Sequence, residues 1–295
     1  MKLLLIGHSV ADIISKDDEK IIQPGGIFYS ASAIKELSTE NDSIFLCTQI
    51  DNKYYNLFER VYESFDISFT EKVKSIPMVE LKVAGHFERK EHYKNLSNKI
   101  KIDYSLLKEF DGILINMITG FDIDVTQLEE IRKSTKALIY FDVHTLSRGL
   151  DEKMHREFRL IPDFNKWAEN IDIIQCNEHE IFTLSQKQNE SEIVKKLFEC
   201  GVKIVCVTKG ESGNRVYCQN KSEVASYFRT TKKISYNNKV GCGDVFGAAF
   251  FYGYISSGDI FKTAELASSS AEFIASINNL SEFRNLKQNV IERYS

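Results

Sequence analysis

The chain alternates between short apolar runs and longer amphipathic stretches. The apolar runs, which predict β-strands, cover residues 2–7, 43–47, 112–116, 137–143, 172–177 and 203–210. Most of them are apolar at every position, which is typical of parallel strands covered on both faces. Helical periodicity is found in residues 28–38, 56–65, 125–134, 190–201 and 260–277. Repeated strand–helix units of this kind predict an α/β fold with a mainly parallel sheet.

Two stretches interrupt this rhythm. Residues 13–23 and 78–94 begin with a strand-like pattern and then become polar or highly charged. They predict either a small sheet that projects from the main domain or a pair of edge hairpins. The chain has only three prolines and no Gly/Ser-rich linker. We therefore expect a single domain over residues 1–295, with the small appendage contributed by residues 13–24 and 76–98.

Composition narrows the possible partners. With 43% apolar and 27% charged residues, the chain can bury a sizeable core. A net charge of −4 and a pI near 6.0 argue against a general nucleic-acid binder. The first apolar run is broken at residues 7–9 and does not resemble a signal peptide, and no stretch is long enough to cross a membrane. The six cysteines form no C-x-x-C pair, so we expect buried reduced thiols and a cytoplasmic protein.

Polar residues follow most of the predicted strands. In open parallel sheets, ligands bind beyond the carboxyl ends of the strands. Any one of these residues is more often a turn residue or a helix cap than a catalytic group. Several of them at one edge of a sheet predict a ligand site: His8, Ser9, Asp12, Asn116, Asp142, His144, Asn177, Glu178, His179, Glu180, Thr208, Lys209, Gly210 and Gly213.

The segment NKVGCGDVFGAAFFYGY (238–254) contains the most informative pattern. Residues 245–255 are apolar nearly all round, which predicts a buried helix. Asp244 could cap the start of that helix. Alternatively, Gly241, Cys242 and Gly243 could offer backbone N–H groups to an anion, with Asp244 beside it as a base. Spacing alone leaves both interpretations open. P-loop and dinucleotide-binding motifs are absent, and the remaining polar groups suit phosphoryl transfer.

Five segments in order resemble motifs of the PfkB/ribokinase family of carbohydrate kinases. NKVGCGDVFGAAF (238–250) resembles its C-terminal signature, and PGGIFYSASAIKEL (24–37) is similar to its Gly-Gly segment. GHSVADII (7–14) is similar to its first strand ending in an aspartate, and NEHE (177–180) and VTKGESG (207–213) to two further motifs. The resemblance implies a ribokinase-like three-layer sandwich. The two interrupting stretches would form a β-lid that closes over the acceptor and can also form a homodimer contact.

The resemblance also implies an activity and its residues. The protein would move the γ-phosphate of ATP, with Mg²⁺, to a hydroxyl group of a small sugar or polyol. Asp244 would be the catalytic base, and the amides of Gly241, Cys242 and Gly243 the anion hole. The acceptor would be bound by Asp12, Gly25, Gly26, Ser30 and Asn116. The nucleotide would be bound by Asn177, Thr208, Gly210 and Gly213, and Glu180 would organise Mg²⁺ through water.

Some positions depart from the family pattern. Asn238 and Lys239 stand where the family usually has Asp and Thr. The sequence therefore does not decide whether the protein has the monovalent-cation site that some members of the family build near this loop. Ser30 stands where many sugar kinases of the family have Asn, and Cys242 replaces the usual alanine. Two alternatives remain: a nucleoside kinase of the same fold, and a regulator that binds a sugar or nucleotide but has little activity.

Overall fold

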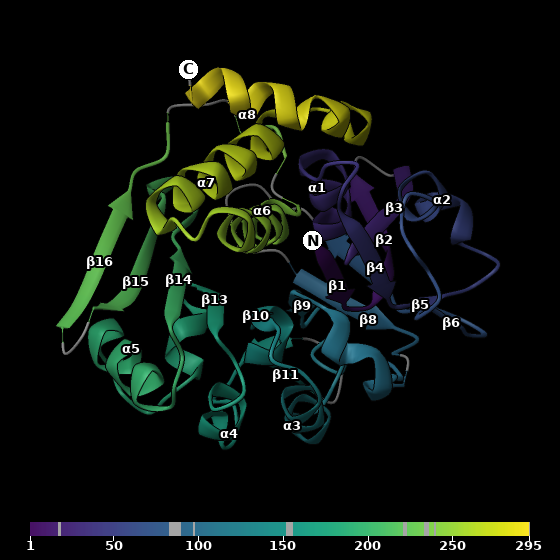
Figure 1. Ribbon diagram of the computed structural model, residues 1–295. Coiled ribbons are helices and arrows are strands. Elements are labelled where there is room, and N and C mark those ends of the chain that lie inside the picture. Colours follow the sequence, from purple (N-terminus) through teal and green to yellow (C-terminus); the bar gives the residue numbers. More distant parts are fainter. Residues whose placement is uncertain are drawn as a thin grey trace.

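Eight strands form the central sheet of the computed structural model, in the order β16-β15-β14-β13-β10-β9-β1-β4 (Figure 1). The structure describes the chain except for residues 17–18, 83–89, 97, 152–155, 221–222, 233–235, 239 and 295. Six of the strands are parallel: β1 (Lys2–Ile6), β4 (Ser43–Cys47), β9 (Gly112–Asn116), β10 (Leu138–Asp142), β13 (Ile173–Asn177) and β14 (Ile204–Thr208). These are the six strands predicted from the apolar runs, within two residues at each end. The α/β class is therefore confirmed.

Helices cover both faces of this sheet. In β1, Leu3 and Leu5 belong to one apolar cluster and Leu4 and Ile6 to the other. The first cluster includes α1 (Phe28–Leu37), α2 (Tyr55–Tyr62), α6 (Cys242–Ser257), α7 (Ile260–Ser276) and α8 (Leu286–Tyr294). The second includes α3 (Val125–Ser134), α4 (Phe164–Ala168) and α5 (Glu190–Glu199), along the lower side of Figure 1. Since both faces of each strand are buried, the strands show no polar alternation.

Two antiparallel strands extend the sheet beyond β14. They are β15 (Asn214–Asn220) and β16 (Glu223–Arg229), and the sequence analysis did not predict them. Most residues of β16 are exposed, so it lacks the continuous apolar run that marks the parallel strands.

A second sheet has four strands in the order β3-β2-β7-β8. They are β2 (Ser9–Lys16), β3 (Glu19–Gly26), β7 (Met78–Lys82) and β8 (Lys90–Lys94), so the two interrupting stretches pair with each other. Residues 17–18, 83–89 and 97 of these stretches lie outside the described residues. The expectation that Asp12 ends the first strand was wrong. β1 ends at Ile6, and Asp12 lies in the middle of β2, which starts two residues after Gly7.

Short elements complete the fold. β5 (Gln49–Ile50) pairs with β6 (Glu71–Lys72), and β11 (Arg148–Leu150) with β12 (Arg156–Phe158). Within the described parts of the chain, no helix is long and apolar enough to span a membrane. α6 is buried from Val245 to Gly253, as its all-round apolar pattern predicts, and it lies between the central sheet and α7 (Figure 1).

Candidate functional site

The start of α6 is the centre of the candidate site. Gly241 precedes the helix with a φ of 79°, in the left-handed region that favours glycine. A Cβ atom added to Gly241 would lie 2.1 Å from the ring of Tyr29, so no other residue fits without displacing that ring. The first backbone N–H groups of a helix have no acceptor within it and carry partial positive charge. The Gly241 turn therefore starts α6 with these donors exposed to a ligand.

A buried asparagine holds the carboxylate of Asp244. Asn116, the last residue of β9, donates from Nδ2 to Asp244 Oδ1 at 2.7 Å. The same nitrogen lies 3.3 Å from the Ser30 hydroxyl, which donates to the Asp244 carbonyl oxygen at 3.3 Å. Asp244 Oδ2 has no hydrogen-bond partner among the described residues, so one carboxylate oxygen is fixed and the other is available to a ligand. Ser30 and Asn116 thus lie behind Asp244.

Two cavities meet at this first helical turn. Asp244 and Gly241 line a small cavity of about 50 Å³, together with Asp12 and Gly26. Cys242 and Gly243 line a large cavity of about 340 Å³. The other predicted residues in the wall of the large cavity are Thr208, Gly210 and Gly213. The start of α6 is therefore a shared wall, with the carboxylate on one side and the glycine-rich backbone on the other.

The second sheet supplies much of the wall of the small cavity. Val10 and Asp12 of β2, Val79 of β7 and Tyr93 of β8 line it. A Cβ atom at Gly25 would lie 2.3 Å from Asp12 Oδ2, so the Asp12 carboxylate packs directly on the backbone of β3. This contact explains why a glycine stands at position 25.

A buried acidic group lies next to Asp244. Burial raises the pKa of Asp142 well above its ordinary value, and the charges of Glu180 and Asp244 raise it further. Burial also raises the pKa of Glu180, although His144 and the N–H of Asn177 oppose this effect. These carboxylates repel one another, so a cation near them would be stabilised.

The N-x-x-E segment forms a closed turn at the end of β13. Asn177 Oδ1 accepts hydrogen bonds from the N–H groups of His179 and Glu180, at 2.9 and 2.8 Å. Glu180 Oε2 accepts the N–H of Asn177 at 2.8 Å. Neither Asn177 nor Glu180 lines the two cavities described above. Among the described residues, no group of three or more His, Cys, Asp or Glu side chains is arranged to hold a metal directly.

The sequence analysis missed Gln175, which anchors the start of α6. Its Nε2 donates to the Gly243 carbonyl oxygen at 2.9 Å, and its Oε1 accepts from the Tyr140 hydroxyl at 2.6 Å. Gln175 is 3% exposed and interrupts the apolar run 172–177. The amide side chain within an otherwise apolar run was the signal in the sequence from which Gln175 could have been predicted as a site residue.

Several further residues of the cavity walls were also missed as site residues. Arg229 and Glu272 lie in the wall of the large cavity and form a buried ion pair at 2.6 Å. His144, which the sequence analysis had already placed among the polar residues after the strands, has a φ of 35° and lies in the wall of the small cavity with Tyr29. Asn238 lines the large cavity, and its side chain accepts from and donates to the backbone of Val240, both at 3.0 Å. Lys239 lies outside the described residues.

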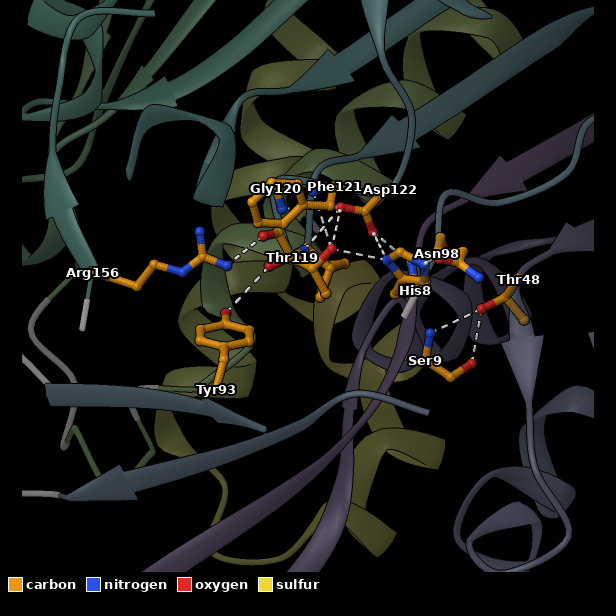
Figure 2. A network of polar contacts seen from close by, with 11 residues as sticks. His8, Ser9, Thr48, Tyr93, Asn98, Thr119, Gly120, Phe121, Asp122 and Arg156 are labelled. Carbon is orange, nitrogen blue, oxygen red and sulfur yellow. Dashed lines mark hydrogen bonds and ion pairs between the residues drawn. The ribbon is translucent and has the colours of Figure 1, made fainter. Parts of the chain in front are cut away.

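A buried polar network holds the junction between the two sheets (Figure 2). His8, just before β2, is fully buried and its Nδ1 lies 3.0 Å from Asp122 Oδ1. Asp122 Oδ1 also accepts the His8 N–H at 2.8 Å, and Oδ2 accepts the Thr119 N–H at 2.9 Å. His8 Nε2 lies 3.2 Å from the carbonyl oxygen of Asn98, just after β8. His8 thus links the segment that enters β2 to the segment that leaves β8.

The network continues to the small cavity. Tyr93 donates from its hydroxyl to the Ile118 carbonyl oxygen at 3.3 Å, and Arg156 donates to the Thr119 carbonyl oxygen (Figure 2). The Arg156 guanidinium lies 4.3 Å from the centre of the Tyr93 ring. The position of Tyr93 in the cavity wall therefore depends on the segment that Asp122 organises.

Comparison with known proteins gives a family match and several structural neighbours. Residues 125–282 match the model of a family described as pfkB family carbohydrate kinase. A 5-dehydro-2-deoxygluconokinase of Clostridium botulinum is 24% identical over 158 residues, which are 52% of this chain and 44% of that protein. The matched segment thus covers less than half of this curated relative.

Two solved structures share the fold over nearly the whole chain. Arabidopsis thaliana ribokinase, complexed with ribose and ATP, has a TM-score of 0.76 and 15% identity, covering 99% of this chain and 97% of its own. A pyrophosphate-dependent kinase in the ribokinase family, complexed with a pyrophosphate analogue and myo-inositol, has a TM-score of 0.76 and 16% identity, covering 99% of both chains. The ribokinase-like fold predicted from the motifs is confirmed.

Proposed function

The chain belongs to the pfkB family of carbohydrate kinases, and from this premise we propose that it phosphorylates a hydroxyl group of a small sugar or polyol with ATP. The observation that carries the proposal is the wall shared by the two cavities. Asp244 faces the small cavity, and Gly243 lies in the wall of the large one. A phosphate acceptor and a phosphate donor would therefore meet at the first turn of α6.

In this mechanism Asp244 is the general base. The acceptor hydroxyl gives its proton to Asp244 Oδ2 while its oxygen attacks the γ-phosphorus atom, and the bond to the β-phosphate oxygen breaks to release ADP. The hydrogen bond from Asn116 fixes the other carboxylate oxygen. Asp12, packed against Gly25, would bind acceptor hydroxyl groups, with Gly26 alongside. Ser30 and Asn116 would act on the acceptor through Asp244.

The backbone of residues 241–243 would receive the transferring phosphate. Helix N-termini bind phosphate because their N–H groups point outward and their dipole favours negative charge. Gln175 holds the Gly243 carbonyl oxygen and so fixes the orientation of this turn. Thr208, Gly210 and Gly213, which also line the large cavity, would contact the nucleotide. Asn177 would not contact the nucleotide directly. It would instead hold the turn that contains Glu180, through the hydrogen bond that its side chain accepts from the Glu180 N–H.

The chemistry of the buried carboxylates fits Mg²⁺ held through water. Burial and mutual repulsion destabilise the charged forms of Asp142 and Glu180, and a divalent cation would offset this repulsion. Mg²⁺ usually keeps several waters and binds substrate phosphates with one or two carboxylates. When bound, it would neutralise charge on the transferring phosphate. The Asn238 side-chain oxygen already accepts a backbone N–H, which argues against its use in a monovalent-cation site.

The size of the large cavity supports a nucleotide rather than pyrophosphate as donor. It has about 340 Å³ and includes the apolar side chains of Phe246, Ala271 and Ala275. Pyrophosphate would leave such an apolar wall uncovered, whereas a nucleoside would cover it. The small cavity, with about 50 Å³, favours a single sugar ring or polyol over a nucleoside as acceptor.

The second sheet would act as the lid over the acceptor, since β2, β7 and β8 line the small cavity. Its edge strand β3 exposes Ile21 and Ile22, at 53% and 46% of their surfaces. An exposed apolar edge strand favours pairing with another chain, which supports a homodimer through the lid.

The six cysteines are free in the structure, which supports a reducing compartment such as the cytoplasm.

An acceptor panel tests the proposed function. Sugars, polyols and nucleosides would be assayed with ATP and Mg²⁺ by ADP release, and in parallel with pyrophosphate by phosphate release. We expect turnover with ATP and one sugar or polyol. In Asp244→Asn, turnover should fall by about 10²- to 10⁴-fold while ATP still stabilises the protein against heat. Binding of ATP without turnover on any acceptor would favour the regulator, and near-normal turnover of the variant would remove Asp244 as base.

A further inference from the structure

A third cavity lies outside the candidate site and is lined by residues of α1, α2 and the segment that precedes α8. Its volume is about 270 Å³. Much of its wall is apolar and comes from Phe28, Leu57, Val61, Leu280 and Phe283. We call it the α1–α2 cavity. It shares no lining residue with the two cavities at the start of α6.

A buried hydroxyl group in this cavity has no partner. Ser32, on α1, lines the cavity and is 2% exposed, and its Oγ makes no hydrogen bond in the structure. Leaving a buried hydroxyl unsatisfied costs about 1–3 kcal/mol. Such a group in the wall of a cavity indicates that an occupant of the cavity supplies the missing hydrogen bond.

Cationic side chains surround the same cavity. Lys35, Arg60 and Arg284 line it, against a single carboxylate, Glu36. Lys35 Nζ donates to the Arg60 carbonyl oxygen at 2.7 Å, which fixes the ammonium group beside α2. Arg60 and Arg284 are exposed and make no ion pair among the described residues. Two unpaired guanidinium groups at the rim of an apolar cavity are suited to bidentate binding of a phosphate group.

We propose that the α1–α2 cavity binds a small phosphomonoester with a compact, mainly apolar body. The phosphate would lie between Arg60 and Arg284 at the rim, where three cations face one carboxylate. The body would pack on Phe28 and Leu57, and a polar atom at its inner end would bond the Ser32 hydroxyl. A phosphomonoester carries about −1.5 to −2 charges at neutral pH, which matches the excess of positive charge.

The α1–α2 cavity is connected to the candidate site through the junction between β3 and α1. Pro24 and Phe28 line it, and between them lie Gly25, which contacts Asp12, and Gly26, which lines the small cavity. A ligand in the α1–α2 cavity would therefore contact both ends of the junction between β3 and α1.

The test uses phenyl phosphate as probe, with phenol and inorganic phosphate as its apolar and anionic halves. Binding to the full chain would be measured by calorimetric titration and thermal stabilisation. We expect phenyl phosphate to bind more tightly than either half. Its affinity should fall at least about tenfold in Arg60→Gln/Arg284→Gln, which removes the charge-assisted contacts at the rim. Ser32→Leu, which fills the cavity, should abolish binding.

Two controls keep the result specific. Lys136→Gln removes an exposed charge on another part of the surface and should leave the affinity unchanged. The arginine variant changes only exposed groups, so it should fold normally even if Ser32→Leu does not. The proposal is overturned if phenyl phosphate does not bind at millimolar concentration. It is equally overturned if both variants bind the probe as the wild type does, since the probe would then occupy another site such as the start of α6.

Discussion

Asn116 Nδ2 and Asp244 Oδ1 lie 2.7 Å apart, although 128 positions separate the two residues in sequence. Asn116 ends β9 of the central sheet, and Asp244 lies in the first turn of α6. The contact therefore joins the sheet to the helix at the point where the two cavities meet. The bond fixes one oxygen of the carboxylate, and the orientation of the second oxygen is thereby also fixed.

Replacing Asn116 by Ala should lower kcat without weakening the donor. The carboxylate of Asp244 would lose the bond that orients it, and a misplacement of about 1 Å can lower a rate about 10²-fold. Donor affinity should stay within about twofold, because Asn116 is not in the wall of the large cavity. Steady-state kinetics with the best acceptor would measure both quantities. Unchanged kcat would show that Asp244 does not depend on Asn116.

Gly241→Ala should remove activity and destabilise the protein, and α6 provides its own control. Gly241 and Gly258 flank the helix with φ values of 79° and 67°. A Cβ atom at Gly241 would meet the Tyr29 ring, whereas one at Gly258 would meet nothing within 4 Å. Gly258→Ala should cost about 1–2 kcal/mol of conformational strain and keep the activity. Gly241→Ala should cost more and lose turnover, as measured by urea unfolding and the kinase assay; equal effects would contradict the role of the Tyr29 contact.

Asp142→Asn should stabilise the protein at neutral pH while lowering activity. The folded-state pKa of Asp142 lies above the unfolded value of about 3.9, so ionising this group opposes folding. The protonated form stabilises the fold below the unfolded pKa, and this stability is lost as the pH rises through the folded pKa. At pH 8 the variant should be more stable than wild type, and the gain should shrink as the pH is lowered. Thermal unfolding at several pH values measures it, and a destabilised variant at pH 8 would refute the prediction.

Asp122→Asn should act in the opposite direction. Burial alone would raise the pKa of Asp122, but the His8 ring and the N–H donors outweigh it and hold the pKa below its ordinary value. This stability is present above the unfolded pKa of about 3.9 and is lost as the pH falls through the lower folded pKa. At pH 7 the variant should lose about 3 kcal/mol or more, because several hydrogen bonds to one buried carboxylate, each worth about 1.5–3 kcal/mol, are weakened together.

Thr119→Val serves as the matched control for Asp122→Asn. It removes the Thr119 hydroxyl, which bonds Asp122 and His8, but keeps the carboxylate. We expect a smaller loss of about 1–3 kcal/mol, with little dependence on pH. If urea unfolding gave the two variants the same stability at pH 7, the charge of Asp122 would not contribute as described.

The parallel half of the fold could be predicted because burial on both faces leaves a direct trace in the sequence. The runs 112–116 and 172–177 are strands for this reason, and their ends supplied Asn116 and Asn177 as candidates. β16 left no such trace. The structure shows that β16 ends at Arg229 and that Arg229 forms an ion pair with Glu272 on α7. An ion pair between residues 43 positions apart has no local signal.

The site itself was only partly predictable. The motif containing Asp244 identified the helix start, but spacing could not separate a cap from a base. The structure adds that Asn116 and Ser30 hold Asp244 from behind, and that Gln175 holds Gly243. These contacts cross from one strand or helix to another, so they depend on the order of the strands in the sheet. Composition and periodicity do not encode that order.

The late position of α6 in the chain has a consequence for synthesis. A ribosome makes residues 1–241, and with them every strand of the central sheet, before it reaches Cys242. Until α6 emerges, the apolar face that it covers, including Leu114 of β9 and Tyr140 of β10, has no partner from this helix. Growing chains with uncovered apolar surface are prone to aggregation. The nascent protein thus passes through a period in which the strands of the sheet have been synthesised and the helix that covers this face has not.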